Sequence, residues 1–250
     1  MQNNIEQNMI IGSEILGIKM EIGHLLLFQR YLSALEKWNQ KLNLTSITNS
    51  KEICVKHFLD SLTALNTVKK CILYKINRNS QIDIIDVGTG AGFPGIPIKI
   101  MLPSLRLALL EAKKKKINFL IELVKDLGLK EVNIVNDRAE IVGRKDDFRE
   151  CYDISISRAV APLAVLYEYA LPLIKKNGWF IALKGRKYKD DLGDGMSALE
   201  LLGGKLFNIE KIQLPILNQE RNIISIRKIK NTPDKYPRKA GLPKKRPLNI

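Results

Sequence analysis

A run of apolar residues from Ile82 to Val87 leads into a glycine-rich turn, and Pro94 and a second apolar stretch follow it. This order is typical of a buried parallel strand that passes into a helix. Glycine permits a tight turn and lets a ligand approach bare main chain. The helix N-terminus that follows favours a polar or anionic ligand group. The stretch therefore predicts an α/β fold with a nucleotide-like ligand over the first strand.

Two overlapping glycine spacings leave the class of ligand open. Gly90-x-Gly92-x-x-Gly95 fits the dinucleotide fingerprint, whereas Asp86-x-Gly88-x-Gly90 fits the first loop of S-adenosylmethionine (SAM) methyltransferases. A glycine-rich turn without any ligand is the third interpretation. Neither spacing decides between them by itself.

Strand and helix signals alternate from Ile82 onward, which favours a parallel sheet. We expect strands over residues 82–87, 105–110, 132–135, 152–157, 178–183, 206–214 and 222–229, with the last two forming an antiparallel hairpin. We expect helices over residues 96–102, 113–127, 163–174 and 188–202. The predicted fold class is α/β, a mostly parallel seven-stranded sheet with helices on both faces.

The flanking segments differ in pattern from this core. Residues 21–39 and 52–68 have helical periodicity, residues 1–20 predict a short helix or a loose lead-in, and residues 75–81 predict a linker. We therefore divide the chain into an N-terminal helical region (1–75) packed on an α/β domain (76–230), and a basic, proline-rich tail (231–250).

The net charge of +15 and the pI near 9.7 indicate a polyanionic partner, with a generally lysine-rich composition as the alternative. The N-terminus carries Glu6 and Glu14 rather than a basic region, and no apolar run has membrane length, so we expect neither a signal peptide nor a membrane segment. Cys54, Cys71 and Cys151 form no Cys-x-x-Cys pair. They indicate reduced thiols in a cytoplasmic protein without a metal site.

Basic residues cluster in places where RNA phosphates could bind. Lys184, Arg186 and Lys187 follow the fifth predicted strand, and the tail contains Arg238 and Lys239. The tail is either a disordered solubilising segment or a strap that contacts phosphates, and the interleaved tyrosine and glycine favour the strap. The run from Lys113 to Lys116 is equally consistent with RNA contact and with a solvated helix face.

The carboxyl ends of parallel strands meet at one edge of a sheet, where ligands of such folds bind. Glu111 follows the second strand, where an acid can accept hydrogen bonds from ribose hydroxyls, and Arg158 follows the fourth. The alternatives are a helix cap for Glu111 and a salt bridge for Arg158. His57 and Asp60 face each other on a helix, either as a structural pair or as an RNA contact.

Five stretches together carry a family resemblance. They are Trp38 to Thr45, His57 to Leu62, Asp86 to Gly95, Ser157 to Ala159 and Tyr236 to Gly241. In these the chain resembles the small-subunit rRNA methyltransferase family called RsmG, or glucose-inhibited division protein B. Departures are small: Glu111 stands where aspartate is common, and Lys113 to Lys116 is unusually basic.

The resemblance implies a Rossmann-like class I fold and SAM-dependent methylation of guanine N7 at position 527 of 16S rRNA, in a loop near the decoding site. At the positions of this chain that match the family's motifs, the resemblance implies that Gly88, Phe93, Ala139, Glu140 and Arg158 contact SAM. We add Gly90 from the glycine turn and Glu111 from its place at a strand end. The implied partner is 16S rRNA or the small ribosomal subunit, bound by a monomer.

An N7 target is chemically consistent with the sequence. Guanine N7 is an unprotonated acceptor, so methylation needs alignment and no general base, and we name no acid–base catalyst. No Asn/Asp-Pro-Pro-Tyr/Phe motif for exocyclic amines follows the fourth strand, and Cys151 precedes that strand. The alternatives are methylation of another RNA or a protein, a non-catalytic RNA-binding assembly factor and, last, an NAD oxidoreductase.

Overall fold

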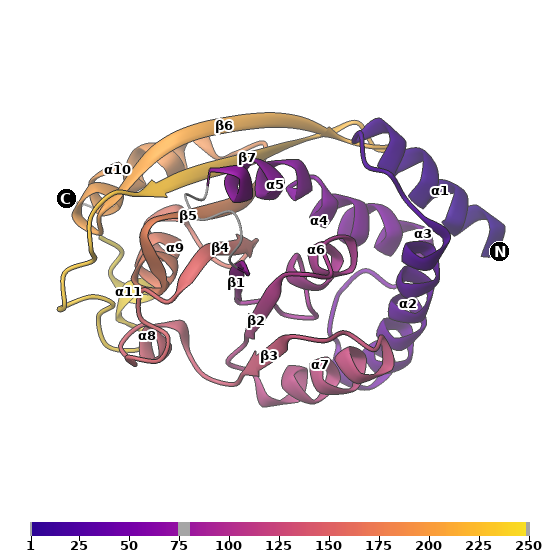
Figure 1. Cartoon of the computed structure of the whole chain (residues 1–250), viewed down its shortest axis with the longest axis horizontal. Coiled ribbons are helices and arrows are strands. Elements are labelled where there is room, and N and C mark those ends of the chain that lie inside the picture. Colours follow the sequence, from indigo (N-terminus) through magenta and orange to yellow (C-terminus); the bar gives the residue numbers. More distant parts are fainter. Residues whose placement is uncertain (1, 75–80, 249–250) are drawn as a thin grey trace.

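The computed structural model describes residues 2–74 and 81–248. Its centre is a seven-stranded sheet in the order β3-β2-β1-β4-β5-β7-β6 (Figure 1). The strands are β1 (Asp83–Val87), β2 (Arg106–Leu110), β3 (Val132–Val135), β4 (Tyr152–Arg158), β5 (Ile174–Gly185), β6 (Gly204–Leu214) and β7 (Gln219–Lys228). Strands β1 to β5 pair in parallel, and β7 is antiparallel to both of its neighbours. The predicted fold class and the closing hairpin are confirmed.

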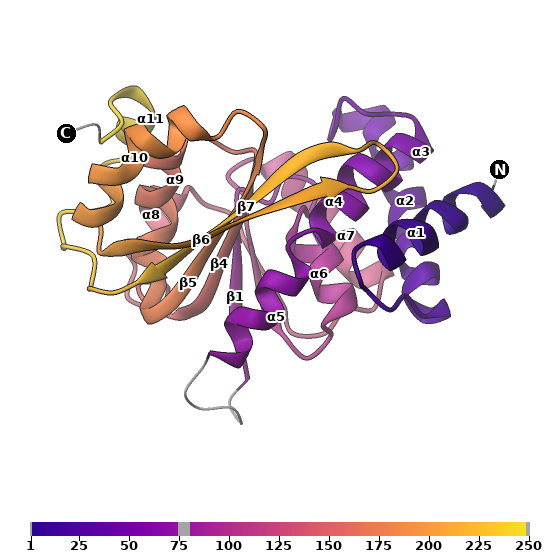
Figure 2. The same cartoon turned by 90° about the horizontal axis from the view of Figure 1, so that it is seen from above.

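Helices cover both faces of this sheet. They are α1 (Gln2–Ile15), α2 (Ile22–Leu42), α3 (Ser50–Ile53), α4 (Asp60–Leu62), α5 (Leu65–Leu73), α6 (Gly95–Met101), α7 (Lys114–Asp126), α8 (Ala139–Val142), α9 (Leu163–Ala170), α10 (Lys189–Leu201) and α11 (Leu242–Lys245). A π-helical segment (Cys54–Leu59) joins α3 to α4, and a 3-10 turn (Leu171–Leu173) follows α9. Helices α1 to α7 lie on one side of the sheet and α8 to α11 on the other (Figure 2).

The strands have apolar side chains on both faces because both faces are covered. Successive residues of a strand point to opposite sides. Ile84 and Ile181 pack into the core beneath the first group of helices. Ile85 packs with the α8 side of the sheet and Phe180 with α9 and α10. The central strands are therefore buried almost completely, as their continuous apolar sequence indicated.

The N-terminal third differs from its prediction in detail. Residues 1–20 contain the long helix α1, and the single helix expected over residues 52–68 is divided into α3, the π-helical segment, α4 and α5. Asn49 starts this series, since its side chain accepts the N–H groups of Lys51 and Glu52. The linker expected at residues 75–81 lies, except for Gln81, outside the described residues.

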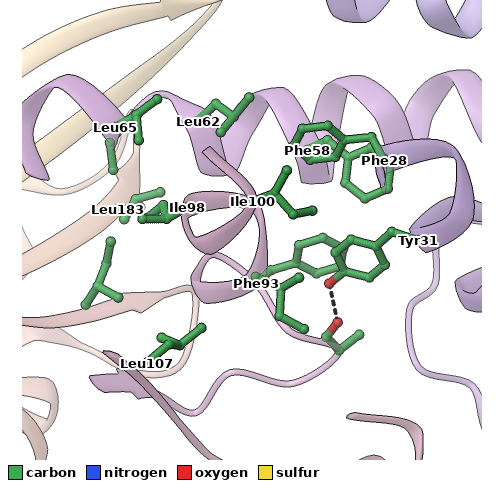
Figure 3. Packing of buried hydrophobic residues seen from close by; sticks show 14 of the residues in the cluster. Phe28, Tyr31, Phe58, Leu62, Leu65, Phe93, Ile98, Ile100, Leu107 and Leu183 are labelled. Atoms are coloured by element: carbon green, nitrogen blue, oxygen red, sulfur yellow. Dashed lines mark hydrogen bonds between the residues drawn. The ribbon is translucent and has the colours of Figure 1, made fainter. Parts of the chain in front are cut away.

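An aromatic cluster joins this helical region to the glycine loop (Figure 3). Phe28 and Tyr31 from α2 each lie 5.1 Å from Phe58, measured between ring centroids, and Tyr31 stacks on Phe93 at 5.2 Å. The Tyr31 hydroxyl donates a 2.5 Å hydrogen bond to the carbonyl oxygen of Ala91. The helical region therefore packs directly against the loop that the sequence assigned to the ligand.

The basic tail packs on the surface beside α8 and α9, and residues 231–248 are called the strap below. Tyr236 and Leu248 are buried in the core between α9 and α10. Arg144 donates to the carbonyl oxygen of Pro237 at 2.7 Å, and Arg149 donates to that of Tyr236 at 2.8 Å. The strap is thus ordered and held by specific contacts with the protein, and its contact with phosphates stays a prediction.

Replacing Tyr31 by phenylalanine tests the junction between α2 and the glycine loop. We expect Tyr31→Phe to lower the free energy of unfolding by about 1–3 kcal/mol, because the buried Ala91 carbonyl loses its donor. Tyr74→Phe is the control, since Tyr74 is 57% exposed, and should change stability by less than about 0.5 kcal/mol. Urea unfolding measures both, and equal effects would contradict this role of Tyr31.

Candidate active site

A cavity of about 740 Å³ opens at the carboxyl ends of β1, β2 and β4. Ligands of open α/β sheets bind at this edge. All seven residues that the sequence nominated for the cofactor line this cavity. They are Gly88, Gly90, Phe93, Glu111, Ala139, Glu140 and Arg158. The structure thus brings together residues that are spread over 71 positions of the chain.

Asp86, fully buried at the end of β1, holds the glycine loop at two points. Its Oδ2 accepts the Thr89 hydroxyl at 2.6 Å and the Gly95 N–H at 2.8 Å. Its Oδ1 has no partner within the described part of the chain. Burial raises the pKa of Asp86 to about 7, and the two hydrogen bonds oppose part of this rise. The carboxyl group therefore shapes the loop and is protonated over most of the acidic range.

Glu111 has the structural role that the sequence left open and also lines the cavity. Its Oε2 accepts the Gly90 N–H at 3.1 Å, and its Oε1 accepts the Lys113 N–H at 2.8 Å, at the start of α7. Each carboxylate oxygen can accept a second hydrogen bond. Glu111 therefore fixes the loop and remains able to accept a ligand hydroxyl.

Arg158 connects the end of β4 to the N-terminal helical region. Its Nη1 donates to Asp60 at 2.8 Å and to the carbonyl oxygens of Lys56 and His57 at 3.3 Å each. Its Nη2 lies 3.2 Å from His57 Nδ1, and the guanidinium carbon is 5.0 Å from the centre of the Phe93 ring. His57 and Asp60, which the sequence placed together, thus meet through Arg158.

The contacts of His57 define its protonation. Because Arg158 donates to Nδ1, the ring proton is on Nε2, which donates to the Thr45 hydroxyl oxygen at 2.8 Å. The ring also stacks on Phe93, with centroids 4.7 Å apart. Burial, and then the charge of Arg158, lower the pKa of His57 to about 4. His57 is therefore neutral near pH 7, and both of its nitrogens are occupied.

The strap supports one wall of the cavity through its contact with Glu140. Glu140 is 5% exposed, and its Oε1 accepts the N–H of Gly241 in the strap at 2.8 Å. Tyr169 also hydrogen bonds to Glu140, and burial together with this carboxylate raises the pKa of Tyr169 to about 12. Contacts from a segment 101 residues further along the chain thus position Glu140.

Several residues of the wall were missed or left undecided by the sequence. Val160 and Tyr169 line the cavity without any prior assignment, Thr45 lines it as part of a motif that was given no role, and His57 was left between a structural pair and an RNA contact. Thr45 and His57 lie in the motifs that carried the family resemblance, which was the available signal. The π-helical segment carries His57, and helical periodicity does not reveal such a segment.

Two of the basic residues predicted to contact RNA have ionic partners within the protein. Lys184 donates to Asp191 at 2.7 Å and to the carbonyl oxygen of Ala161 at 2.8 Å. Arg238 forms a two-pronged ion pair with Glu168, which is fully buried. Their positive charges are thus paired within the protein, and contact of these two side chains with RNA stays a prediction.

The remaining basic candidates are exposed to solvent. Arg186, Lys187 and Lys239 are exposed, and Lys113 and Lys116 lie on the cavity wall itself. Cations in such positions are available to phosphates.

The described residues contain no group of three or more His, Cys, Asp or Glu side chains placed to hold a metal. In the same residues, no helix is long and apolar enough to cross a membrane. The three cysteines are free thiols, and burial raises the pKa of Cys54 and Cys71 to about 12.

The strand order and the cavity at its carboxyl edge define a Rossmann-like class I methyltransferase fold. A SAM-dependent methyltransferase from Aquifex aeolicus has the same fold, with a TM-score of 0.53 and 14% identity over 75% of this chain and 97% of its own. The family model for rRNA small subunit methyltransferase G matches residues 25–224.

Curated relatives agree with the family model. Two proteins named ribosomal RNA small subunit methyltransferase G, from Desulforamulus reducens and a Thermoanaerobacter species, are 46% and 42% identical to this chain. The matches cover 89% and 99% of this chain and 90% and 100% of those proteins. The chain belongs to the rRNA small subunit methyltransferase G family, and the family predicted from the sequence motifs is confirmed.

The raised pKa of Asp86 predicts a pH-dependent stability. Between about pH 4 and pH 7 the folded chain keeps a proton that the unfolded chain releases, so this group lowers the free energy of unfolding as pH rises. The free energy of unfolding falls by up to about 1.4 kcal/mol for each pH unit in this window. Because asparagine cannot ionise, the stability of Asp86→Asn relative to wild type should rise over this window and level off above it. Denaturant unfolding at several pH values measures the stability of both proteins. If the two stabilities changed with pH in parallel, the raised pKa of Asp86 would be contradicted.

The ion pair between Arg238 and Glu168 predicts a large structural effect. Arg238→Ala leaves a buried carboxylate without its partner and should cost about 3–5 kcal/mol of unfolding free energy. Lys239→Ala, at the exposed neighbouring position, should cost less than about 0.5 kcal/mol. Thermal and urea unfolding compare the two variants. An Arg238→Ala protein of normal stability that had lost RNA affinity would instead support Arg238 as an RNA contact.

Proposed function

We propose that the protein binds SAM in the cavity at the ends of β1, β2 and β4 and methylates rRNA with it. The observation that carries this proposal is the convergence of the seven nominated residues on that cavity. The residues fit the cofactor chemically. Gly90 has a φ of +63°, and the nearest neighbours of a Cβ atom there are Lys116 Nζ at 3.5 Å and the Gly88 oxygen at 3.9 Å, so main chain is open to a ligand.

The wall residues divide between the two ends of such a cofactor. We assign the amino-acid end to the loop of Gly88, Gly90 and Phe93, where Arg158 offers a positive charge to a carboxylate. We assign Glu111 to the ribose hydroxyls, and Ala139 and Glu140 to the base. When bound, SAM supplies an electrophilic methyl group on a sulfonium centre.

We further propose that the acceptor is N7 of guanine 527 in 16S rRNA. An N7 acceptor carries a lone pair and loses no proton, so it requires no general base. The ionisable groups of the wall suit this requirement. His57 is neutral with both nitrogens occupied, Glu111 and Glu140 accept main-chain N–H groups, and Asp137 pairs with Lys145.

The contribution of the chain to the reaction is then alignment. Arg158 and His57 are held by several hydrogen bonds each, so the wall facing the acceptor is rigid. Holding an acceptor in line with a methyl donor can supply much of the rate enhancement.

We assign RNA phosphates to Arg186, Lys187 and Lys239, since these cations are exposed and the protein carries a net charge of +15. The partner is 16S rRNA or the small ribosomal subunit, bound by a monomer in the cytoplasm. Nucleoside mass spectrometry of 16S rRNA from cells with and without the protein tests the acceptor. Loss of a methylated nucleoside other than 7-methylguanosine would replace the N7 assignment, and methylation of another RNA would replace the substrate.

Blocking the cavity tests the cofactor site. A Cβ atom at Gly88 would lie 2.8 Å from the Val160 side chain, at a φ of +72°. Gly88→Asp should therefore weaken SAM binding at least about 100-fold and abolish methyl transfer, by steric conflict and added negative charge. Gly23→Asp is the matched control, because a side chain there enters open space at the N-terminus of α2. Calorimetric titration with SAM measures both, and full affinity in Gly88→Asp would refute the site.

A further inference from the structure

A second cavity, of about 510 Å³, adjoins the candidate active site and is called the α2 groove below. It lies between the C-terminal turns of α2 and the segment that leads to α3. Thr45 and Ser46 line both cavities. Ile53, which is 1% exposed, provides an apolar wall. The α2 groove and the candidate active site therefore share a rim.

The polar lining of the groove is one face of a helix. Glu36, Asn39, Gln40 and Asn43 follow the i, i+3, i+4, i+7 spacing, which places them side by side. Up to Leu35, α2 places large apolar residues in the core. In its last two turns, amides and a carboxylate line an open groove instead. No core packing accounts for these polar side chains.

Some of these groups have structural partners, and two do not. Asn39 Oδ1 accepts the Thr45 N–H at 2.9 Å, and Glu36 accepts the Ser50 hydroxyl at 2.6 Å. The side-chain amides of Gln40 and Asn43 are exposed and make no hydrogen bond within residues 2–74 and 81–248. They offer donors and acceptors to a ligand in the groove.

The chemistry of the groove selects its ligand. A carboxylate and several neutral amides and hydroxyls disfavour a phosphate but match the edges of a nucleobase, which mix donors and acceptors. Lys37 and Lys41 are exposed on the same helix and do not line the groove, so phosphates have cations beside it. Proteins read single-stranded RNA by binding splayed bases in such polar recesses.

We propose that the α2 groove binds one unstacked nucleobase of the RNA, next to the base that is methylated. This inference rests on the proposed function, in which the substrate is RNA. The active-site cavity has the size of a cofactor site with room for a target base, since small-molecule sites measure about 300–1,000 Å³. The groove then holds a neighbouring base and fixes the register of the strand through Gln40 and Asn43.

A double-mutant cycle between protein and RNA tests this proposal. The protein variant is Gln40→Ala with Asn43→Gly, in which glycine preserves the left-handed backbone at φ 47°. Ser33→Ala, at an exposed position of α2 outside the groove, is the control. The RNA probes are stem–loops of the methylated region, either intact or abasic at each position that flanks the target guanine. Affinity, methylation rate and SAM binding are measured for every pair.

We expect one abasic position to weaken wild-type binding about 10-fold. The groove variant should bind intact RNA about 10-fold more weakly, yet lose no further affinity at that abasic position, while SAM binding stays unchanged. If the affinity losses caused by the groove variant and by the abasic position multiplied, the proposal would be overturned. It would also be overturned if the wild-type protein bound every RNA with an abasic flanking position as tightly as the intact RNA. A wild-type protein that neither binds nor methylates the intact RNA would instead overturn the proposed function, and the inference with it.

Discussion

The carboxylate of Asp60 holds the two halves of the molecule in register. It accepts Arg158 Nη1 at 2.8 Å from the end of β4 and Arg221 Nε at 2.5 Å from β7, although it belongs to the N-terminal helical region. Buried ion pairs add little net stability, but they penalise every arrangement in which a partner is missing. Here that penalty fixes where Arg158 lies. The positions of His57 and Thr45, and with them the boundary between the two cavities, depend on Arg158.

The strands and the cavity residues could be predicted because they follow from short-range rules. Apolar runs end at polar or glycine residues, and parallel strands bring those ends to one edge. Charged side chains could not be assigned in this way. Lys184 and Arg238 read as free cations in the sequence, yet Asp191 and Glu168, which neutralise them, are identified only by the folded chain. The π-helical segment was equally hidden, because it changes the direction of His57 without changing the apolar pattern.

Several cations in the interior of the protein are paired with acidic side chains, whereas many of those at the surface are not. In the interior, Arg158 is balanced by Asp60, and Lys228 lies beside Glu150, with burial lowering the pKa of this lysine to about 8. At the surface, much of the basic excess has no such partner. The interior charges therefore orient side chains, whereas the surface charges set a long-range field that attracts a polyanion.

Because Gly241 contacts Glu140, the ligand site forms later than the sheet when the chain folds during translation. Chains are synthesised from the N-terminus, at about 5–20 residues per second, and their elements begin to fold as they emerge. Glu140 is made 101 residues before the glycine that positions it. The strands at whose ends the cavity lies can therefore associate before Glu140 has this partner. During translation the protein passes through a state with a formed sheet and an unfinished ligand site, and the site matures only when the strap has left the ribosome.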